Sequence, residues 1–171
     1  MAVREILHFG NPALRATCSA IDEERPDQGI MKDLQDTLTH LQRMEGLGRG
    51  LAAPQIGHQV RAVYINAPAW EGFLLNPHVV NRSDETFEIM DGCFSAALSF
   101  FGPVKRHRWV EVCYRDATMK PCQEAFRGDM SELIQHEMDH LNGILFIDRL
   151  TDPSRIMTRG EWEKRCRVDR R

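Results

Sequence analysis

Apolar residues recur at three- and four-residue steps in two stretches of the chain, and each stretch predicts an amphipathic helix. In the first stretch, residues 26–46, the apolar positions are Ile30, Met31, Leu34, Leu38, Leu41 and Met44. Asp27 has the side chain of an N-cap residue, and Gly46 suits the position after the last turn. We therefore expect this helix to lay one apolar face against a core.

The second stretch, residues 128–143, has the same periodicity and ends at Gly143, which suits a C-terminal cap. Asp129 and Glu132 lie three residues apart near its start, as the two partners of a capping box do. The pattern predicts a second helix that begins with this capping box.

Between the two helices, β-branched and aromatic residues lie between turn signals, which is typical of strands. The expected strands cover residues 60–66, 73–75 with 79–80, 86–89 and 104–114. We expect Asn76-Pro77 to break one of them. Because strands and helices do not alternate regularly, the pattern predicts an α+β fold. Its mostly antiparallel sheets would pack around the second helix, with the first helix and a C-terminal tail or helix beside them.

Length and composition fit one domain, since 171 residues with 42% hydrophobic and 27% charged residues can bury a core. We expect this domain to cover residues 1–154 and a basic tail, as an extension or a helix, to cover residues 155–171. The tail holds seven Lys and Arg against three Asp and Glu, so it carries +4 in a chain of net charge −3. That balance argues against a general nucleic-acid-binding surface.

The chain contains five cysteines, and an odd number argues against a disulfide framework. No apolar run reaches the roughly 18 residues of a membrane-spanning helix, and the first residues lack the apolar stretch of a secretory signal. These features favour a cytoplasmic protein with free thiols and no membrane contact.

The second predicted helix carries the sequence HEMDH at residues 136–140, which is an HExxH motif. The spacing places His136 and His140 on one helix face, where their neutral nitrogens can bind one divalent cation. Glu137 follows the first histidine, where it can exchange a proton with a water that the metal acidifies. The motif therefore predicts a metal-dependent hydrolase.

A catalytic divalent site usually has a third protein ligand, and spacing leaves two candidates for it. A metzincin would have a third histidine where this chain has Phe146, so that class is excluded. Cys93 follows Gly92 after a predicted strand, whereas Glu161 in the tail would complete a thermolysin-like site. The residue pattern alone does not choose between Cys93 and Glu161.

The segment GRGLAAPQ, residues 48–55, is glycine-rich but lacks the GK[ST] ending of a phosphate-binding loop. It predicts a tight, close-packed loop. The amide of Gln55 at its end can donate a hydrogen bond to an oxyanion.

Three segments taken together resemble the peptide deformylase family: GRGLAAPQ (48–55), DGCFS (91–95) and QHEMDH (135–140). ILHFGNPALR (6–15) and FLLNP (73–77) are also similar to the family, so the resemblance covers nearly the whole chain. It implies hydrolysis of the N-formyl group of N-formylmethionyl nascent peptides, with release of formate. It also implies peptide substrates as partners, and the basic tail indicates contact with the ribosome without sequence-specific nucleic-acid binding.

The resemblance implies a role for each matching residue. The implied metal ligands are Cys93, His136 and His140. The implied ion is Fe²⁺, with Zn²⁺, Ni²⁺ or Co²⁺ as substitutes. The implied catalytic groups are the Glu137 carboxylate as general base and acid, the Gln55 amide and the backbone N–H of Phe94. The implied substrate-binding residues are Gly50, Gly92 and Arg49.

Several positions depart from the family pattern. Asp91 replaces a usual Glu, so its contact to a basic residue such as Arg106 is either rebuilt or lost. Arg49 and Glu132 stand where apolar residues are usual, and residues 96–102 lack a common proline. These departures keep open an alternative function, a deformylase-like amidase that acts on another formylated or acylated small substrate.

Overall fold

The computed structural model describes residues 3–168 and forms an α+β fold. Within that range the α-helices are α1 (Gln28–Glu45), α2 (Asp129–Leu141) and α3 (Arg159–Val168). None of the three combines the length and hydropathy that a bilayer crossing requires.

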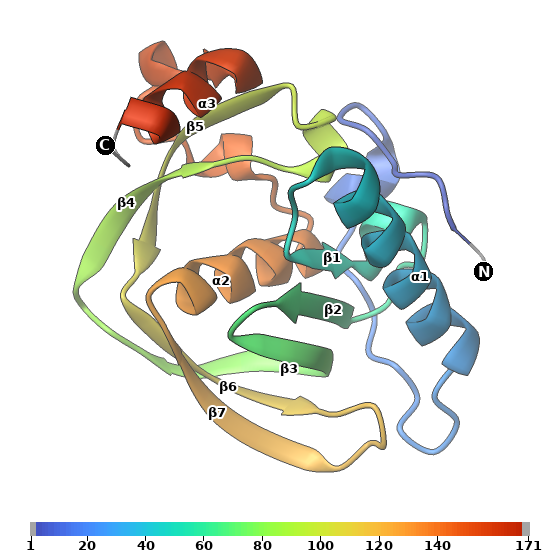
Figure 1. The fold of residues 1–171 in the computed structure, drawn as a ribbon. Coiled ribbons are helices and arrows are strands. Elements are labelled where there is room, and N and C mark those ends of the chain that lie inside the picture. The colour runs from blue at the N-terminus through green and yellow to red at the C-terminus, as the bar shows by residue number, and fades with distance from the viewer. Residues whose placement is uncertain (1–2, 169–171) are drawn as a thin grey trace.

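The strands form two antiparallel sheets (Figure 1). The larger sheet has the order β1-β2-β3-β6-β7, with bounds Gly50–Ala52, Ala62–Ala67, Trp70–Arg82, Trp109–Arg115 and Pro121–Arg127. The smaller sheet has the order β4-β5-β8, with bounds Thr86–Asp91, Phe100–His107 and Met157–Thr158. In the described range β1 and β4 are therefore each an edge strand of their sheet.

Helix α2 lies between the two sheets and contacts strands of both (Figure 1). Leu133, Ile134 and Leu141 pack into the core of the larger sheet. The other faces of α2 are buried as well, and both histidines of the HExxH motif lie in the protein interior. A helix buried on all sides must satisfy its polar side chains with protein partners or a bound ion, and this concentrates the chemistry of the chain around α2.

Helix α1 has the caps that its sequence predicts. The Asp27 side chain accepts a hydrogen bond from the backbone N–H of Gly29 at 2.8 Å, and Gly46 ends the helix in the left-handed conformation, with φ of 66°. Ile30, Leu34 and Leu38 on its apolar face are buried in the core. Both ends of α1 are therefore explained by the residue at the boundary: the Asp27 side chain at the start and the backbone freedom of Gly46 at the end.

The capping box expected at the start of α2 is wrong. The N-cap is Gly128, which has no side chain to offer, and Asp129 is already the first helical residue. The carboxylate of Glu132 binds Arg49 instead of a backbone N–H at the helix start. A long-range ion pair has replaced the local contact that the spacing predicted.

The expected break at Asn76-Pro77 is a bulge within the continuous strand β3. Its pairing with β6 changes register between Leu75 and His78, and Asn76 has φ of 50°. The Asn76 side chain bonds both the backbone N–H and the carbonyl of Ile21, at 2.7 and 3.0 Å. The N-terminal segment thereby holds the irregular backbone in place.

The single strand expected over residues 104–114 is two strands in different sheets. Strand β5 ends at His107 and β6 begins at Trp109, and between them the N–H of Arg108 donates to the Glu85 carbonyl at 3.0 Å. Strand β7 was not expected, because its residues are mostly polar and exposed.

Part of the basic tail packs onto the smaller sheet. Strand β8 pairs with β5, and α3 follows directly and lies over β5. Residues 169–171 of the tail lie outside the described residues.

Candidate active site

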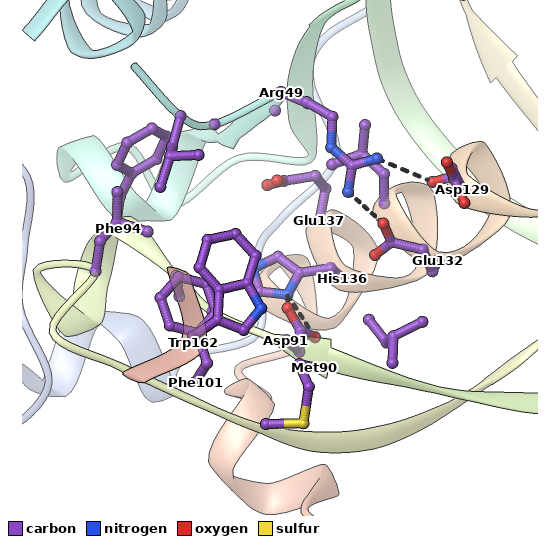
Figure 2. A pocket seen from close by; sticks show the side chains of 18 of the residues that line it. Arg49, Met90, Asp91, Phe94, Phe101, Asp129, Glu132, His136, Glu137 and Trp162 are labelled. Carbon is purple, nitrogen blue, oxygen red and sulfur yellow. Dashed lines mark hydrogen bonds and ion pairs between the residues drawn. The ribbon is translucent and has the colours of Figure 1, made fainter. Parts of the chain in front are cut away.

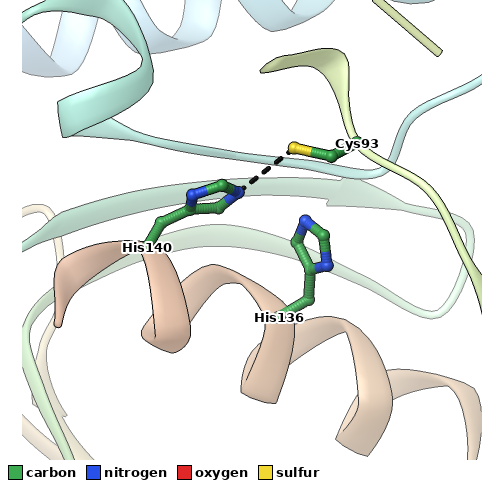
Figure 3. Close-up of side chains that lie close together, drawn as sticks. All are labelled: Cys93, His136 and His140. Carbon is green, nitrogen blue, oxygen red and sulfur yellow. Dashed lines mark hydrogen bonds between the residues drawn. The ribbon is translucent and has the colours of Figure 1, made fainter. Parts of the chain in front are cut away.

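Helix α2 and the turn after β4 bring together three buried side chains that could hold a metal ion: Cys93, His136 and His140 (Figure 3). Their ligand atoms all lie within 4.8 Å of one another, and Cys93 Sγ is 3.3 Å from His140 Nε2. One thiolate and two imidazoles suit a borderline-soft divalent ion. Burial and the neighbouring His136 lower the pKa of His140, which keeps its imidazole neutral, as a metal ligand must be. The donor set therefore fits one divalent cation.

The other candidate ligand, Glu161, lies on α3 at the surface. Its carboxylate binds Lys164 at 2.5 Å, and Glu161 does not belong to the cluster formed by Cys93 and the two histidines. Of the two residues that the spacing left open, the structure brings only Cys93 to the HExxH histidines.

Asp91, the last residue of β4, orients the first histidine. Its carboxylate accepts a hydrogen bond from His136 Nδ1 at 3.0 Å, which leaves His136 Nε2 free to face Cys93. The same carboxylate accepts a hydrogen bond from Arg106 at 2.9 Å. Burial alone would raise the pKa of Asp91, but His136 and Arg106 hold it below its usual value. The contact to a basic residue is therefore rebuilt with the shorter aspartate side chain.

Asp139 extends this network, and the sequence analysis did not single it out. Arg106 also donates to Asp139 at 2.5 Å, and Arg149 donates to the same carboxylate at 2.7 Å. Arg106 is thus a buried cation between two carboxylates, which offsets the cost of burying its charge. Asp139 lies three residues after His136 on α2, and that helical spacing is the signal that links it to the site.

The carboxylate of Glu137 is buried beside the metal-binding cluster, with 3% of the residue exposed. Burial raises the pKa of Glu137 to about 7, a value suited to taking and returning a proton near neutral pH. A Cβ atom on Gly50 would lie only 2.6 Å from Glu137 Oε1. The absence of a side chain at Gly50 is therefore what allows β1 to approach this carboxylate.

Gln55 lies next to Cys93 and is 1% exposed. Its Oε1 accepts a hydrogen bond from the Ala52 N–H at 2.9 Å, which directs Nε2 toward Cys93 Sγ at 3.4 Å and Ser95 Oγ at 3.3 Å. Phe94 begins the 3₁₀ turn Phe94–Ala96, where the first backbone N–H groups have no partner inside the turn. The backbone N–H of Ser95 donates to Cys93 Sγ at 3.4 Å, so this N–H and the Gln55 amide are two donors to the thiol. Ser95, the acceptor for the amide, was not predicted.

A pocket of about 480 Å³ opens onto these groups (Figure 2). One side is polar and includes Arg49, Asp129 and Glu132. The other side is apolar and includes Phe94, a predicted site residue, with Phe101 and Trp162, which were not predicted to belong to the site. A substrate in the pocket would therefore meet a charged wall and an aromatic wall.

On the polar side, Arg49 and Glu132 form an ion pair across the pocket mouth (Figure 2). Glu132 is largely buried whereas the Arg49 side chain is 40% exposed. Burial raises the pKa of Glu132, and the guanidinium of Arg49 opposes that rise. The two residues that depart from the family pattern thus compensate each other's charge.

The pocket lies where edge strand β1 and the end of edge strand β4 come together. Gly50 begins β1, and Gly92 follows β4 directly. A Cβ atom on Gly92 would lie 2.4 Å from the ring of Phe101, so this position too requires glycine. Both glycines line the pocket with backbone rather than with side chains.

Comparisons with known proteins agree on one family. The family model described as "Polypeptide deformylase" matches residues 3–155, a range that ends before α3. "Peptide deformylase 1" of Prochlorococcus marinus is 36% identical over 181 aligned positions, which cover 95% of this chain and 88% of that protein.

Solved structures match as well. The peptide deformylase of Thermotoga maritima superposes with a TM-score of 0.80 at 28% identity, over 89% of this chain and 100% of that one. The Synechococcus elongatus peptide deformylase, solved in complex with actinonin, has a TM-score of 0.80 at 28% identity, over 91% of this chain and 82% of that one.

Proposed function

The chain belongs to the polypeptide deformylase family, and on that premise we propose that it removes the N-formyl group from N-formylmethionyl peptides and releases formate. The observation that carries the proposal is the convergence of Cys93 with His136 and His140, with the Glu137 carboxylate beside them. This is the donor set and the general base that metal-dependent amide hydrolysis needs.

The proposed cofactor is one divalent ion, Fe²⁺, for which Zn²⁺, Ni²⁺ or Co²⁺ can substitute. Cys93, His136 and His140 would hold it. When bound, such an ion polarises a carbonyl oxygen and lowers the pKa of a water molecule. The network of Asp91, Arg106 and Asp139 supports this role, because a fixed partner at Nδ1 sets the orientation and tautomer of His136.

The substrate peptide is proposed to bind in extended form between β1 and the end of β4. Gly50 and Gly92 would offer backbone groups to it, as an edge strand does when a further strand is added. Arg49 lines the pocket, and its guanidinium would contact the peptide there. The formyl group is the smallest acyl group, so only it needs to reach the buried cluster.

In the reaction, water adds to the formyl carbon and the C–N bond breaks. Glu137 takes the proton of the attacking water and delivers it to the leaving amine. The Gln55 amide and the N–H of Phe94 would donate hydrogen bonds to the oxyanion that develops on the formyl oxygen. The Gln55 amide is held in position before substrate arrives, because its Oε1 accepts a hydrogen bond from the Ala52 N–H.

The experiment measures the free amine that anaerobically purified protein releases from formyl-Met-Ala-Ser, free formylmethionine and acetyl-Met-Ala-Ser, together with formate from the two formylated substrates. We expect turnover of the formylated peptide and little or none of the other two. Turnover of formylmethionine in preference to the peptide would contradict a peptide substrate. Comparing turnover of the acetylated and formylated peptides tests whether the cavity excludes an acyl group that is one methyl group larger.

The basic tail is proposed to contact the ribosome, where formylated nascent chains emerge, and the protein is proposed to act in the cytoplasm. Lys164 and Arg165 on α3 are exposed and available for such a contact. Replacing both by glutamate should weaken co-sedimentation with ribosomes. Lys32→Glu on α1, also exposed, is the matched control. Equal co-sedimentation of all three proteins would reject the proposal.

A further inference from the structure

Helix α3 contributes an aromatic side chain to the pocket, although it lies outside the range that the family model matches. We propose that Trp162 is a substrate-contacting residue that, stacked on Phe101, receives an apolar side chain of a peptide residue following the formylated one. The inference rests on the proposed function, since it names a specificity determinant for that reaction.

Contacts made by the residues just before Trp162 set the position of its indole. Strand β8 pairs with β5 through Phe101 and Met157, and the backbone N–H of Arg159 donates to the Ser99 carbonyl at 3.1 Å. The Arg159 guanidinium then donates to the Glu45 carboxylate at 2.6 Å and to the Glu45 carbonyl at 2.8 Å. These contacts tie the start of α3 to β5 and to the end of α1.

The indole of Trp162 lies flat against Phe101. The ring centroids are 4.3 Å apart and the planes differ by 4°. Phe101 is 5% exposed, and its ring lies directly against the backbone of Gly92. Because Gly92 precedes the metal-binding Cys93, the stack continues the wall of the pocket outward from the cluster.

The difference in burial between the metal-binding cluster and Trp162 indicates which part of a substrate would contact the wall of Trp162 and Phe101. Cys93 and His136 are buried, whereas Trp162 is only half-buried. The formyl carbon must reach the buried cluster, so the residues after the first pass the outer, half-buried part of the pocket. An indole stacked on a second ring presents a rigid apolar surface there, at low cost in side-chain entropy.

The opposite wall does not offer the same surface. It consists of Arg49, Asp129 and Glu132, whose charged groups would lose water if an apolar side chain covered them (Figure 2). An extended peptide directs successive side chains to opposite sides. The side chain of a residue after the formylated one can therefore reach the wall of Trp162 and Phe101.

The test compares formyl-Met-Leu-Ser with formyl-Met-Ala-Ser in the wild type and in Trp162→Ala, Trp162→Phe and Trp109→Ala. We expect the wild type to favour the leucine peptide in kcat/KM by about three- to tenfold, the range of one aromatic contact. Trp162→Ala should remove that preference, chiefly by raising KM for the leucine peptide. Trp162→Phe should keep most of it. Trp109→Ala, which removes an indole from β6 outside the pocket lining, should leave the ratio unchanged.

A purely structural role for Trp162 gives a different result. In that case Trp162→Ala lowers thermal stability or slows both peptides equally and leaves their ratio as in the wild type, which would overturn the inference. If Trp162→Ala does not fold, tryptophan fluorescence of the wild type and of Trp162→Phe tests the inference instead. The product Met-Leu-Ser should change tryptophan emission in the wild type and not in Trp162→Phe, and equal changes contradict the inference. Failure of the wild type to deformylate either peptide would instead reject the proposed function.

Discussion

The carboxylate of Asp91 lies 3.0 Å from Nδ1 of His136, on the side of the imidazole that faces away from Cys93. The Arg106 guanidinium donates a hydrogen bond to the same Asp91 carboxylate at 2.9 Å. The orientation of a proposed metal ligand thus depends on a residue of β4 and a residue of β5. The role of Asp91 can therefore be tested without changing the proposed ligands.

Asp91→Asn should weaken metal binding by about 10- to 100-fold, the usual effect of losing the carboxylate partner of a metal-binding histidine. The amide keeps the size of the side chain but removes the charge that His136 and Arg106 bind. Competition with a chelator measures the affinity. Asp84→Asn, an exposed aspartate before β4, is the matched control and should bind metal as the wild type does. An unchanged affinity in Asp91→Asn would show that His136 needs no orienting partner.

Gln55→Leu should lower kcat by about 10²- to 10³-fold, the cost of removing one oxyanion donor, with metal content unchanged. Because Gln55 also accepts from the Ala52 N–H, circular dichroism must show that the variant folds. Ser95→Ala serves as the control, since it removes only the hydroxyl beside the amide and leaves both donors. Similar losses of kcat in the two variants would argue that the amide acts structurally.

Arg49→Ala should destabilise the fold by on the order of 1 kcal/mol at neutral pH, because it leaves the largely buried Glu132 without its cation. The loss should depend on pH. Burial raises the pKa of Glu132 above its usual 4.5 in the folded state, and removing Arg49 raises this pKa further. Such a group favours folding while protonated, at low pH, and that contribution is lost as pH rises through the folded pKa.

Urea unfolding at pH 5 and pH 7.5 therefore checks the pair, with the larger loss for Arg49→Ala expected at pH 7.5. Adding Glu132→Gln to Arg49→Ala should recover stability at pH 7.5 and flatten the difference between the two pH values. An Arg49→Ala loss that is the same at both pH values would mean that Glu132 does not carry a charge in the native pocket.

Features set by neighbours in sequence could be predicted, as α1 and the HExxH motif illustrate. Asp27 and Gly46 cap α1 through contacts within a few residues, and helical geometry alone places His136 and His140 on one face. Strand β7 could not be predicted, because its polar residues carry no apolar alternation and its pairing with β6 provides the order.

The rest of the site depends on contacts that no spacing encodes. The residue pattern allowed either Cys93 or Glu161 as the third metal ligand. In the structure, β4 and the turn after it bring the Cys93 thiol to the histidines of α2. Glu132 was expected to cap its own helix, yet the burial of α2 directs it toward Arg49. Trp162 reaches the pocket only because β8 pairs with β5, and a two-residue strand leaves almost no trace in the sequence.

The most direct test of the central claim measures metal content and formate release together, in the wild type and in Glu137→Gln, with formyl-Met-Ala-Ser as substrate. Cys93, His136 and His140 are intact in the variant, so both proteins should bind about one divalent ion per chain. Only the wild type should release formate at an appreciable rate, because the amide of Gln cannot take up and return the proton. Metal-loaded wild type that releases no formate, or Glu137→Gln that releases it as fast as the wild type, would contradict the account.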